Sequence, residues 1–260
     1  DSPRVHGGPL TAEEWIFEPR DFIRYWRSLH TGSTDPVRLP PRTVFVFDDG
    51  FYDASVKALH ARAIDWNPRV SLGRAGRYAV AVVRSSIGAP AAAIELEESI
   101  ALGARTIVSF GSCGSLIPEL PIGHAVVPTA AFSDEGTSRR CGGAPWARPD
   151  SSLVRRLRSV FRKRSIAVRE GGVWTTDAVY RESRSKARSL VRRGIVGVEM
   201  EASALFTIGR YRHVRVAGVL VVSDELAGEA WTPGFERPAF RSGIRKTLGI
   251  IVEAMSGGLA

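Results

Sequence analysis

The segment SSIGAPAAAIELEESIALGARTIVSFGSCGSL, residues 85–116, decides the class of fold. A Gly-Pro turn opens a predicted helix over residues 88–104, with apolar anchors at Ile94, Leu96, Ile100 and Leu102. The run TIVSFGSCGSL that follows, residues 106–116, predicts a buried strand that breaks into a Gly-Ser loop. A helix leading directly into a buried strand is typical of an α/β sheet.

The same alternation of strands and helices continues along the chain in both directions. Short apolar runs predict further strands at residues 43–47, 78–86, 124–132, 171–177 and 214–223. Helical spacing of apolar residues predicts helices at residues 18–29, 52–63, 154–165 and 236–255. No repeat or low-complexity linker divides the chain. We therefore expect one α/β domain over residues 1–260, with helices on both faces of its sheet.

Charge and cysteine content narrow the classes of function. The net charge is +9, but the arginines are scattered, and the densest cluster forms the polar face of the predicted helix at 154–165. Nucleic-acid binding is therefore disfavoured. Cys113 and Cys141, the two cysteines, lack the paired spacing of a zinc site or a disulfide scaffold, so we expect no metal or other cofactor and a reducing cytoplasm. No apolar run is long enough to span a membrane, and the first ten residues lack the apolar core of a signal peptide.

Polar stretches stand where predicted strands end. They are GSCGS at residues 111–115, TTDAVY at 175–180 and SDEL at 223–226. In α/β sheets, ligands bind beyond the carboxyl ends of strands. A fourth stretch, GVEMEASALF at residues 197–206, places two carboxylates around one of only two methionines, just before a helix of small residues. Together these stretches predict a small-molecule site.

In order and separation, these stretches resemble those of the nucleoside phosphorylase and nucleosidase superfamily. This is the group of purine nucleoside phosphorylase, uridine phosphorylase and methylthioadenosine nucleosidase. The resemblance runs from Thr43 to Leu226, and its most specific part is VEMEAS followed by SD. It implies one phosphorylase-like catalytic domain, a central mixed sheet partly curled into a barrel, a nucleoside substrate, no membrane partner, and a homo-oligomer such as a dimer or a trimer of dimers.

The resemblance also implies a role for the two carboxylates. Cleavage of an N-glycosidic bond passes through an oxocarbenium-like sugar, and hydrogen bonds to the sugar hydroxyls tighten in that transition state. Glu201 is expected to be a catalytic residue that accepts hydrogen bonds from the ribose hydroxyls. Met200 is expected to form an apolar wall under the sugar. Glu199 faces either the sugar edge or solvent.

Asp224 is the second expected catalytic residue. A purine leaves poorly as an anion, and an acid that protonates a ring nitrogen eases its departure. In the family, an aspartate at this position marks the purine branch, and the residues with which uridine phosphorylases read uracil are not evident after Tyr180. The expected base pocket is Val179, Tyr180, Ser223, Asp224, Cys113 and Gly114.

The phosphate site of the family is altered in this chain. The family has a glycine-rich loop ending in an arginine after its first strand, but here Asp48 stands near the glycine position and Tyr52 near the arginine position. Ser109 replaces a second arginine. The residues expected around the acceptor or anion are Ser112, Ser86, Gly111 and Asp48. Because acids repel phosphate, water is slightly favoured as the acceptor.

The sequence is also compatible with two other functions. The chain is alternatively a phosphate-dependent purine nucleoside phosphorylase with a rebuilt anion site that uses Arg69, Arg74, Arg84 or an arginine of a neighbouring subunit. It is alternatively a catalytically silent relative that binds nucleosides, although retention of Glu201 and Asp224 argues against this.

Three further features have a functional and a structural interpretation. Arg139 and Arg140 follow SDEGTS, a stretch similar to a family loop, and indicate either an acidic substituent on the substrate or a solvated hairpin tip. His6 is either a residue that reaches a neighbouring ribose site or part of an unordered terminus. Trp231 is either an aromatic cover over the base or a surface anchor.

Overall fold

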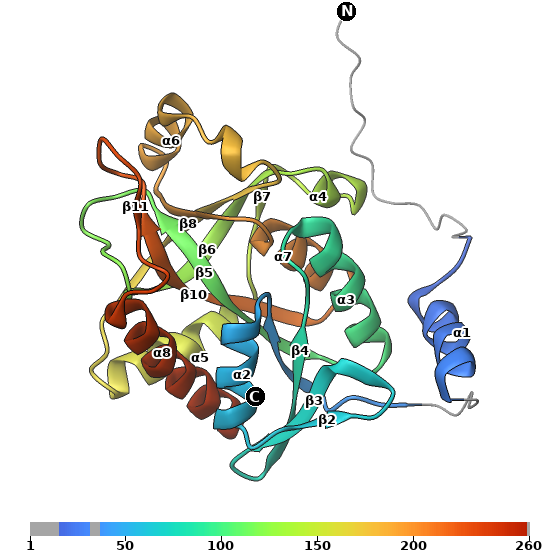
Figure 1. Ribbon diagram of the computed structural model, residues 1–260. Helices are drawn as coiled ribbons and strands as arrows, with labels where there is room; N and C mark the ends of the chain where they lie inside the picture. Colours follow the sequence, from blue (N-terminus) through green and yellow to red (C-terminus); the bar gives the residue numbers. More distant parts are fainter. Residues whose placement is uncertain (1–15, 32–36, 259–260) are drawn as a thin grey trace, which may run out of the picture.

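The computed structural model describes residues 16–31 and 37–258 (Figure 1). In that part of the chain the strands are β1 (Arg42–Val46), β2 (Arg62–Ile64), β3 (Asn67–Ala75), β4 (Tyr78–Arg84), β5 (Thr106–Ser115), β6 (Ala125–Asp134), β7 (Trp146–Ala147), β8 (Val168–Thr176), β9 (Ile195–Glu199), β10 (Arg215–Glu225) and β11 (Thr232–Pro233). The helices are α1 (Pro19–Thr31), α2 (Asp49–Ala58), α3 (Ala89–Ala101), α4 (Thr137–Arg140), α5 (Ser151–Lys163), η1 (Val179–Arg181), α6 (Arg184–Val191), α7 (Ala202–Tyr211) and α8 (Pro238–Ser256).

Five strands close into a mixed barrel within a larger sheet. Their order is β10-β6-β8-β9-β5, and β5 then pairs in parallel with β10 to complete the ring. The other pairs are antiparallel for β10–β6 and β9–β5, and parallel for β6–β8 and β8–β9. From β5 the sheet continues outward through β1, β4, β3 and β2. The expected partly barrel-like mixed sheet is therefore confirmed.

Helices cover the sheet on both sides (Figure 1). α8 packs against α2 and α5, whereas α3 packs against α7, and α1 lies outside α3. The amphipathic helix predicted around residues 154–165 is α5, whose apolar face buries Leu157 and Phe161. Burial of such side chains is the main driving force for folding. No helix among the described residues is long and apolar enough to cross a membrane.

Local differences from the sequence-based expectations have simple causes. The helix expected over residues 52–63 is α2, which starts earlier and ends at Ala58, because residues 62–64 pair with β3 in a hairpin that the sequence did not reveal. The strand expected to break into a loop at Gly111 instead continues to Ser115, because pairing with β10 and β9 extends over the Gly-Ser stretch. Ile94, an expected apolar anchor of α3, is 60% exposed.

Candidate functional site

A cavity of about 540 Å³ lies at the carboxyl ends of β1, β5, β9 and β10. The carboxyl ends of β1, β5 and β10 meet there because these three strands run parallel to one another. The end of β9 joins them because Val198 pairs with Gly114 near the end of β5. The cavity is lined by Phe47, Asp48, Ile87, Ser112, Cys113, Gly114, Val179, Tyr180, Glu182, Val198, Glu199, Met200, Glu201, Ser223, Asp224, Leu226, Trp231 and Phe235. It is within the size range of sites that enclose small molecules.

Glu201 stands between the end of β9 and the start of α7, with its side chain buried. Its Oε1 accepts a hydrogen bond of 2.6 Å from the backbone N–H of Gly88. Gly88 adopts a φ of +102°, a conformation that glycine tolerates far better than other residues, and it precedes α3. Burial raises the pKa of the Glu201 carboxyl, and the neighbouring Glu199 raises it further.

Glu199 has a different environment from Glu201. Its Oε2 accepts hydrogen bonds from the backbone N–H groups of Glu201 and Ala202, at 2.8 and 2.7 Å, and its Oε1 accepts one from the Thr175 hydroxyl. These bonds satisfy donors at the start of α7, which has no capping bond from Glu201 itself. Burial nevertheless leaves the pKa of Glu199 raised. The geometry therefore gives Glu199 a capping role, and a contact with sugar stays a prediction.

Asp224 lies at the end of β10 with both oxygens engaged. Ser223 Oγ donates to Oδ1 at 2.6 Å, and Trp231 Nε1 donates to Oδ2 at 2.8 Å. Ser223 also reaches the carbonyl of Cys113 on β5. Gly114 permits this approach, because a Cβ there would lie 2.4 Å from Leu226 Cδ1 and 3.2 Å from Asp224 Oδ2. Asp224 is thus oriented by one neighbour and covered by another.

The other expected base-pocket residues also border the cavity. Cys113 is buried in its wall, Val179 is 45% exposed, and Tyr180 is 90% exposed at its rim. Met200 lies between the two glutamates on the same wall. The structure therefore brings together all the residues expected around the ribose and the base.

Glu182 lines the cavity but was not expected there from the sequence. It follows η1, and burial, together with the nearby charge of Asp224, raises the pKa of its carboxyl to about 7. The available signal was its place two residues after Tyr180, which is a cavity residue too. Trp231, which the sequence left undecided, is part of the cavity wall.

The four residues expected at the acceptor site separate in the structure. Asp48 and Ser112 line the cavity, whereas Gly111 and Ser86 are not among its lining residues. Gly111 lies under the Phe47 ring, which a Cβ would approach to 2.8 Å. Asp48 Oδ1 accepts from the N–H of Phe51 and caps α2. Burial raises the pKa of Asp48.

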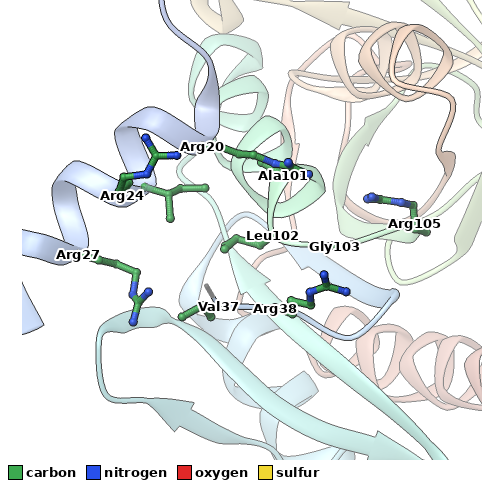
Figure 2. A pocket seen from close by; sticks show the side chains of 10 residues that line it. Arg20, Arg24, Arg27, Val37, Arg38, Ala101, Leu102, Gly103 and Arg105 are labelled. Carbon is green, nitrogen blue, oxygen red and sulfur yellow. The ribbon is translucent and has the colours of Figure 1, made fainter. Parts of the chain in front are cut away.

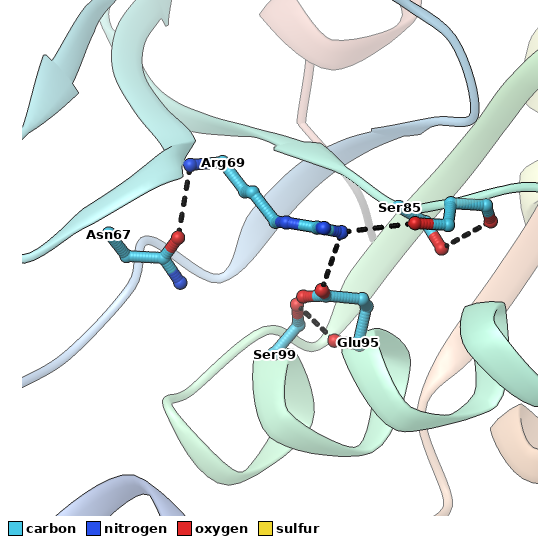
Figure 3. Close-up of polar contacts among 6 residues, drawn as sticks. Asn67, Arg69, Ser85, Glu95 and Ser99 are labelled. Carbon is cyan, nitrogen blue, oxygen red and sulfur yellow. Dashed lines mark hydrogen bonds and ion pairs between the residues drawn. The ribbon is translucent and has the colours of Figure 1, made fainter. Parts of the chain in front are cut away.

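Ser86 contacts Arg69 and does not line the cavity, and Figure 3 shows Arg69 reaching toward Glu95 on α3. Arg69 Nη1 donates to Ser86 Oγ at 3.2 Å and to Glu95 Oε1 at 3.3 Å. Arg84 forms an ion pair with Asp49, and Arg74 donates a hydrogen bond to the backbone carbonyl of Arg77. None of these three arginines lines the cavity in the described chain.

Ser109 and Tyr52, which stand where the family is expected to have phosphate-binding arginines, each contact another part of the protein. Ser109 is buried in the barrel wall, with its hydroxyl 3.4 Å from the carbonyl of Ala217. The Tyr52 hydroxyl is 2.7 Å from Ser71 Oγ on β3. Neither residue lines the cavity.

The SDEGTS stretch also makes internal contacts. Glu135 accepts hydrogen bonds from Ser133, Ser138 and Ser203, which outweigh the effect of burial and lower its pKa. Arg139 and Arg140 are exposed and do not line the cavity. A role for them at the substrate stays a prediction. His6 lies outside the described residues.

Comparisons with known proteins agree with this architecture. The sequence profile of the phosphorylase superfamily matches residues 55–255. A DeoD-type purine nucleoside phosphorylase of Myxococcus xanthus is 32% identical over 175 residues, which are 66% of this chain and 73% of the relative. A guanosine phosphorylase of Halorubrum lacusprofundi is 30% identical over 146 residues, which are 56% of this chain and 61% of the relative.

Solved structures share the fold. Purine nucleoside phosphorylase from Toxoplasma gondii in complex with immucillin-H superposes with a TM-score of 0.73 at 21% identity, covering 84% of this chain and 91% of the other. AMP nucleosidase from Bacteroides thetaiotaomicron superposes with a TM-score of 0.68 at 20% identity, covering 92% of this chain and 100% of the other. At these identities the likeness shows the fold.

Proposed function

The chain belongs to the phosphorylase superfamily, and on that premise we propose that it cleaves the N-glycosidic bond of a purine-type nucleoside and passes the sugar to water. Its relatives and structural neighbours are nucleoside phosphorylases and nucleosidases, which are enzymes that cleave glycosidic bonds. The purine preference rests on Asp224 at the end of β10 and on the purine and guanosine phosphorylases among the relatives.

The choice of water rests on one observation: the charged residues that line the described cavity are all acids. They are Asp48, Glu182, Glu199, Glu201 and Asp224. A phosphate dianion about 4–5 Å from one ionised carboxylate is repelled by roughly 3–4 kcal/mol per unit charge at an effective dielectric constant of about 20. Water carries no charge and escapes that repulsion.

The proposed reaction divides the work among three carboxyl groups. Glu201 is held by a hydrogen bond from the Gly88 N–H. It accepts hydrogen bonds from the sugar hydroxyls and stabilises the oxocarbenium-like transition state. After the indole N–H of Trp231 releases Oδ2, Asp224 takes up a proton from solvent at that oxygen and delivers it to the leaving base. Asp48, made more basic by burial, takes a proton from the attacking water.

The second candidate is phosphorolysis, and the names of the most similar relatives favour it. Several are phosphorylases, and Arg69 already contacts Ser86, one residue before the cavity residue Ile87. For this route Arg69 has to exchange Glu95 for phosphate, or a neighbouring copy of the chain has to supply an arginine. Assembly into a homo-oligomer stays a prediction.

The deciding experiment follows release of free base from inosine, adenosine and uridine, with and without millimolar phosphate. The proposal expects base from a purine nucleoside at the same rate in both conditions, with free sugar as the product. Base release only with phosphate, with stoichiometric sugar 1-phosphate, would establish the second candidate. Release from uridine alone would contradict the purine preference, and tight nucleoside binding without any base release would indicate a silent binding protein.

A further inference from the structure

A second cavity, of about 350 Å³, lies between α1 and the C-terminal end of α3 (Figure 2). Apolar residues form part of its wall, among them Val37 and Leu102. The charged residues around it are all arginines in the described part of the chain: Arg20, Arg24, Arg27, Arg38 and Arg105. We call this the arginine pocket.

The five arginines come from three segments that fold together. Arg20, Arg24 and Arg27 lie on one face of α1, at helical spacing. Arg38 precedes β1, and Arg105 precedes β5. The cavity therefore forms only because α1 packs against α3, while backbone hydrogen bonds hold the end of α3 beside the segments that precede β1 and β5.

Two of the arginines are held in place by the protein. Arg27 is only 8% exposed, and its guanidinium lies 5.6 Å from the centre of the Trp66 ring. Arg105 Nη1 donates to the carbonyls of Ile100 and Ala104, at 2.9 and 2.7 Å, near the end of α3. These contacts hold the two side chains beside the cavity.

The positive charge of the three exposed arginines of the pocket, Arg20, Arg24 and Arg38, is poorly balanced. Arg24 has an acidic neighbour in Asp21, but that pair is 3.5 Å apart with both side chains at least half exposed, so it contributes little. Arg20 and Arg38 are exposed. Like charges gathered in one hollow repel one another, and an anion bound among them relieves the repulsion.

We propose that the arginine pocket binds a small polyanion with two or more phosphate groups. Guanidinium groups bind phosphate oxygens with paired N–H donors, and several guanidiniums on different sides of a hollow match several phosphates better than one. The volume is at the lower end of the range for small-molecule sites, and the apolar wall leaves room for an uncharged part of the ligand.

This site is distinct from the catalytic cavity. Arg38 and Arg105 precede the first residues of β1 and β5, whereas the catalytic cavity lies at the carboxyl ends of the same strands. From Thr106 to Ser112 along β5 the rise is about 20 Å. A polyanion in the arginine pocket is therefore out of reach of the catalytic carboxylates.

The test is calorimetric titration of the full chain with inorganic tripolyphosphate at moderate salt. We expect saturable binding with a dissociation constant below about 1 mM. The variant Arg20→Ala/Arg38→Ala should bind at least about tenfold more weakly, because it loses two charge-assisted contacts. The matched control is Arg188→Ala/Arg192→Ala, which removes two exposed arginines on and just after α6 and changes the net charge equally. Thermal unfolding should show that both variants remain folded.

Each result has a clear meaning. Selective loss of binding in Arg20→Ala/Arg38→Ala, with binding unchanged in the control and in Glu201→Gln, would support the arginine pocket. Equal weakening in both arginine variants would show non-specific attraction and overturn the proposal. Absence of tripolyphosphate binding would overturn the proposal as well. Binding of single-stranded RNA through these arginines, without any binding of tripolyphosphate, would also overturn it. None of these results depends on whether water or phosphate is the acceptor in the catalytic cavity.

Discussion

Replacing Trp231 by Phe tests whether the indole competes with the substrate for Asp224. The indole N–H lies 2.8 Å from Asp224 Oδ2, the oxygen that Ser223 leaves open. In the proposed reaction the leaving base needs an oxygen of this carboxyl, so the indole bond has to break first. Phe keeps an aromatic ring beside the cavity and removes only the N–H donor.

The magnitude follows from the exposure of the tryptophan. A hydrogen bond to a charged group contributes about 1.5–3 kcal/mol. Trp231 is 58% exposed, so water replaces much of the lost contact, and a value of about 1–1.5 kcal/mol is expected. That corresponds to a KM lower by roughly five- to tenfold, with kcat nearly unchanged, because the cost falls on substrate binding.

The assay is initial-rate measurement of base release over a range of nucleoside concentrations. Phe235→Leu is the matched control, because Phe235 is a half-exposed aromatic of the same cavity. It should not lower KM. A higher KM in Trp231→Phe, or a tenfold loss of kcat, would refute the reasoning and show that the indole positions Asp224 in the reacting state.

Three further predictions concern single carboxyl groups. Glu201→Gln should lower kcat by at least about tenfold, because the carboxylate grips the sugar most strongly in the transition state; single-turnover rates equal to wild type would remove Glu201 from the mechanism. Asp48→Asn should keep the cap on α2, since Asn caps helices as well as Asp, yet lower phosphate-independent base release by about 100-fold; a folded variant with full activity would exclude Asp48 as the base. Glu98→Gln should raise the free energy of unfolding at pH 8 and change it little at pH 5, because burial raises the pKa of Glu98 from 4.5 to about 7, so its favourable contribution is lost as pH rises through that range. Urea unfolding at both pH values should show a difference of about 1 kcal/mol after allowance for solvent screening, and the opposite sign would contradict the burial argument.

Patterns within short segments carried the fold class and the outline of the site. Helical spacing located α5, and apolar runs located β1, β4 and β10, because both depend on residues close together in the chain. Three polar stretches at strand ends and the stretch GVEMEASALF pointed to one small-molecule site, and residues of all four stretches line the cavity. The β2–β3 hairpin escaped prediction, because its charged and polar strands lie on the edge of the sheet and lack an apolar run.

Tertiary structure decided what each carboxyl group does. Glu199 and Glu201 are two residues apart in one motif, yet one caps α7 and the other reaches Gly88, because the chain turns between them from β9 into α7. Glu182 and Trp231 join Asp224 only through loops that leave β8 and β10.

The sequence by itself thus determined which chemical groups are present and which segments become strands and helices, since periodicity and local propensity act over a few residues. Only the folded chain decided which arginines face a cavity and which pair with acids. That choice depends on burial and on contacts between segments distant in the chain, and the same residue type therefore forms an ion pair at Arg84 and borders a second cavity at Arg38.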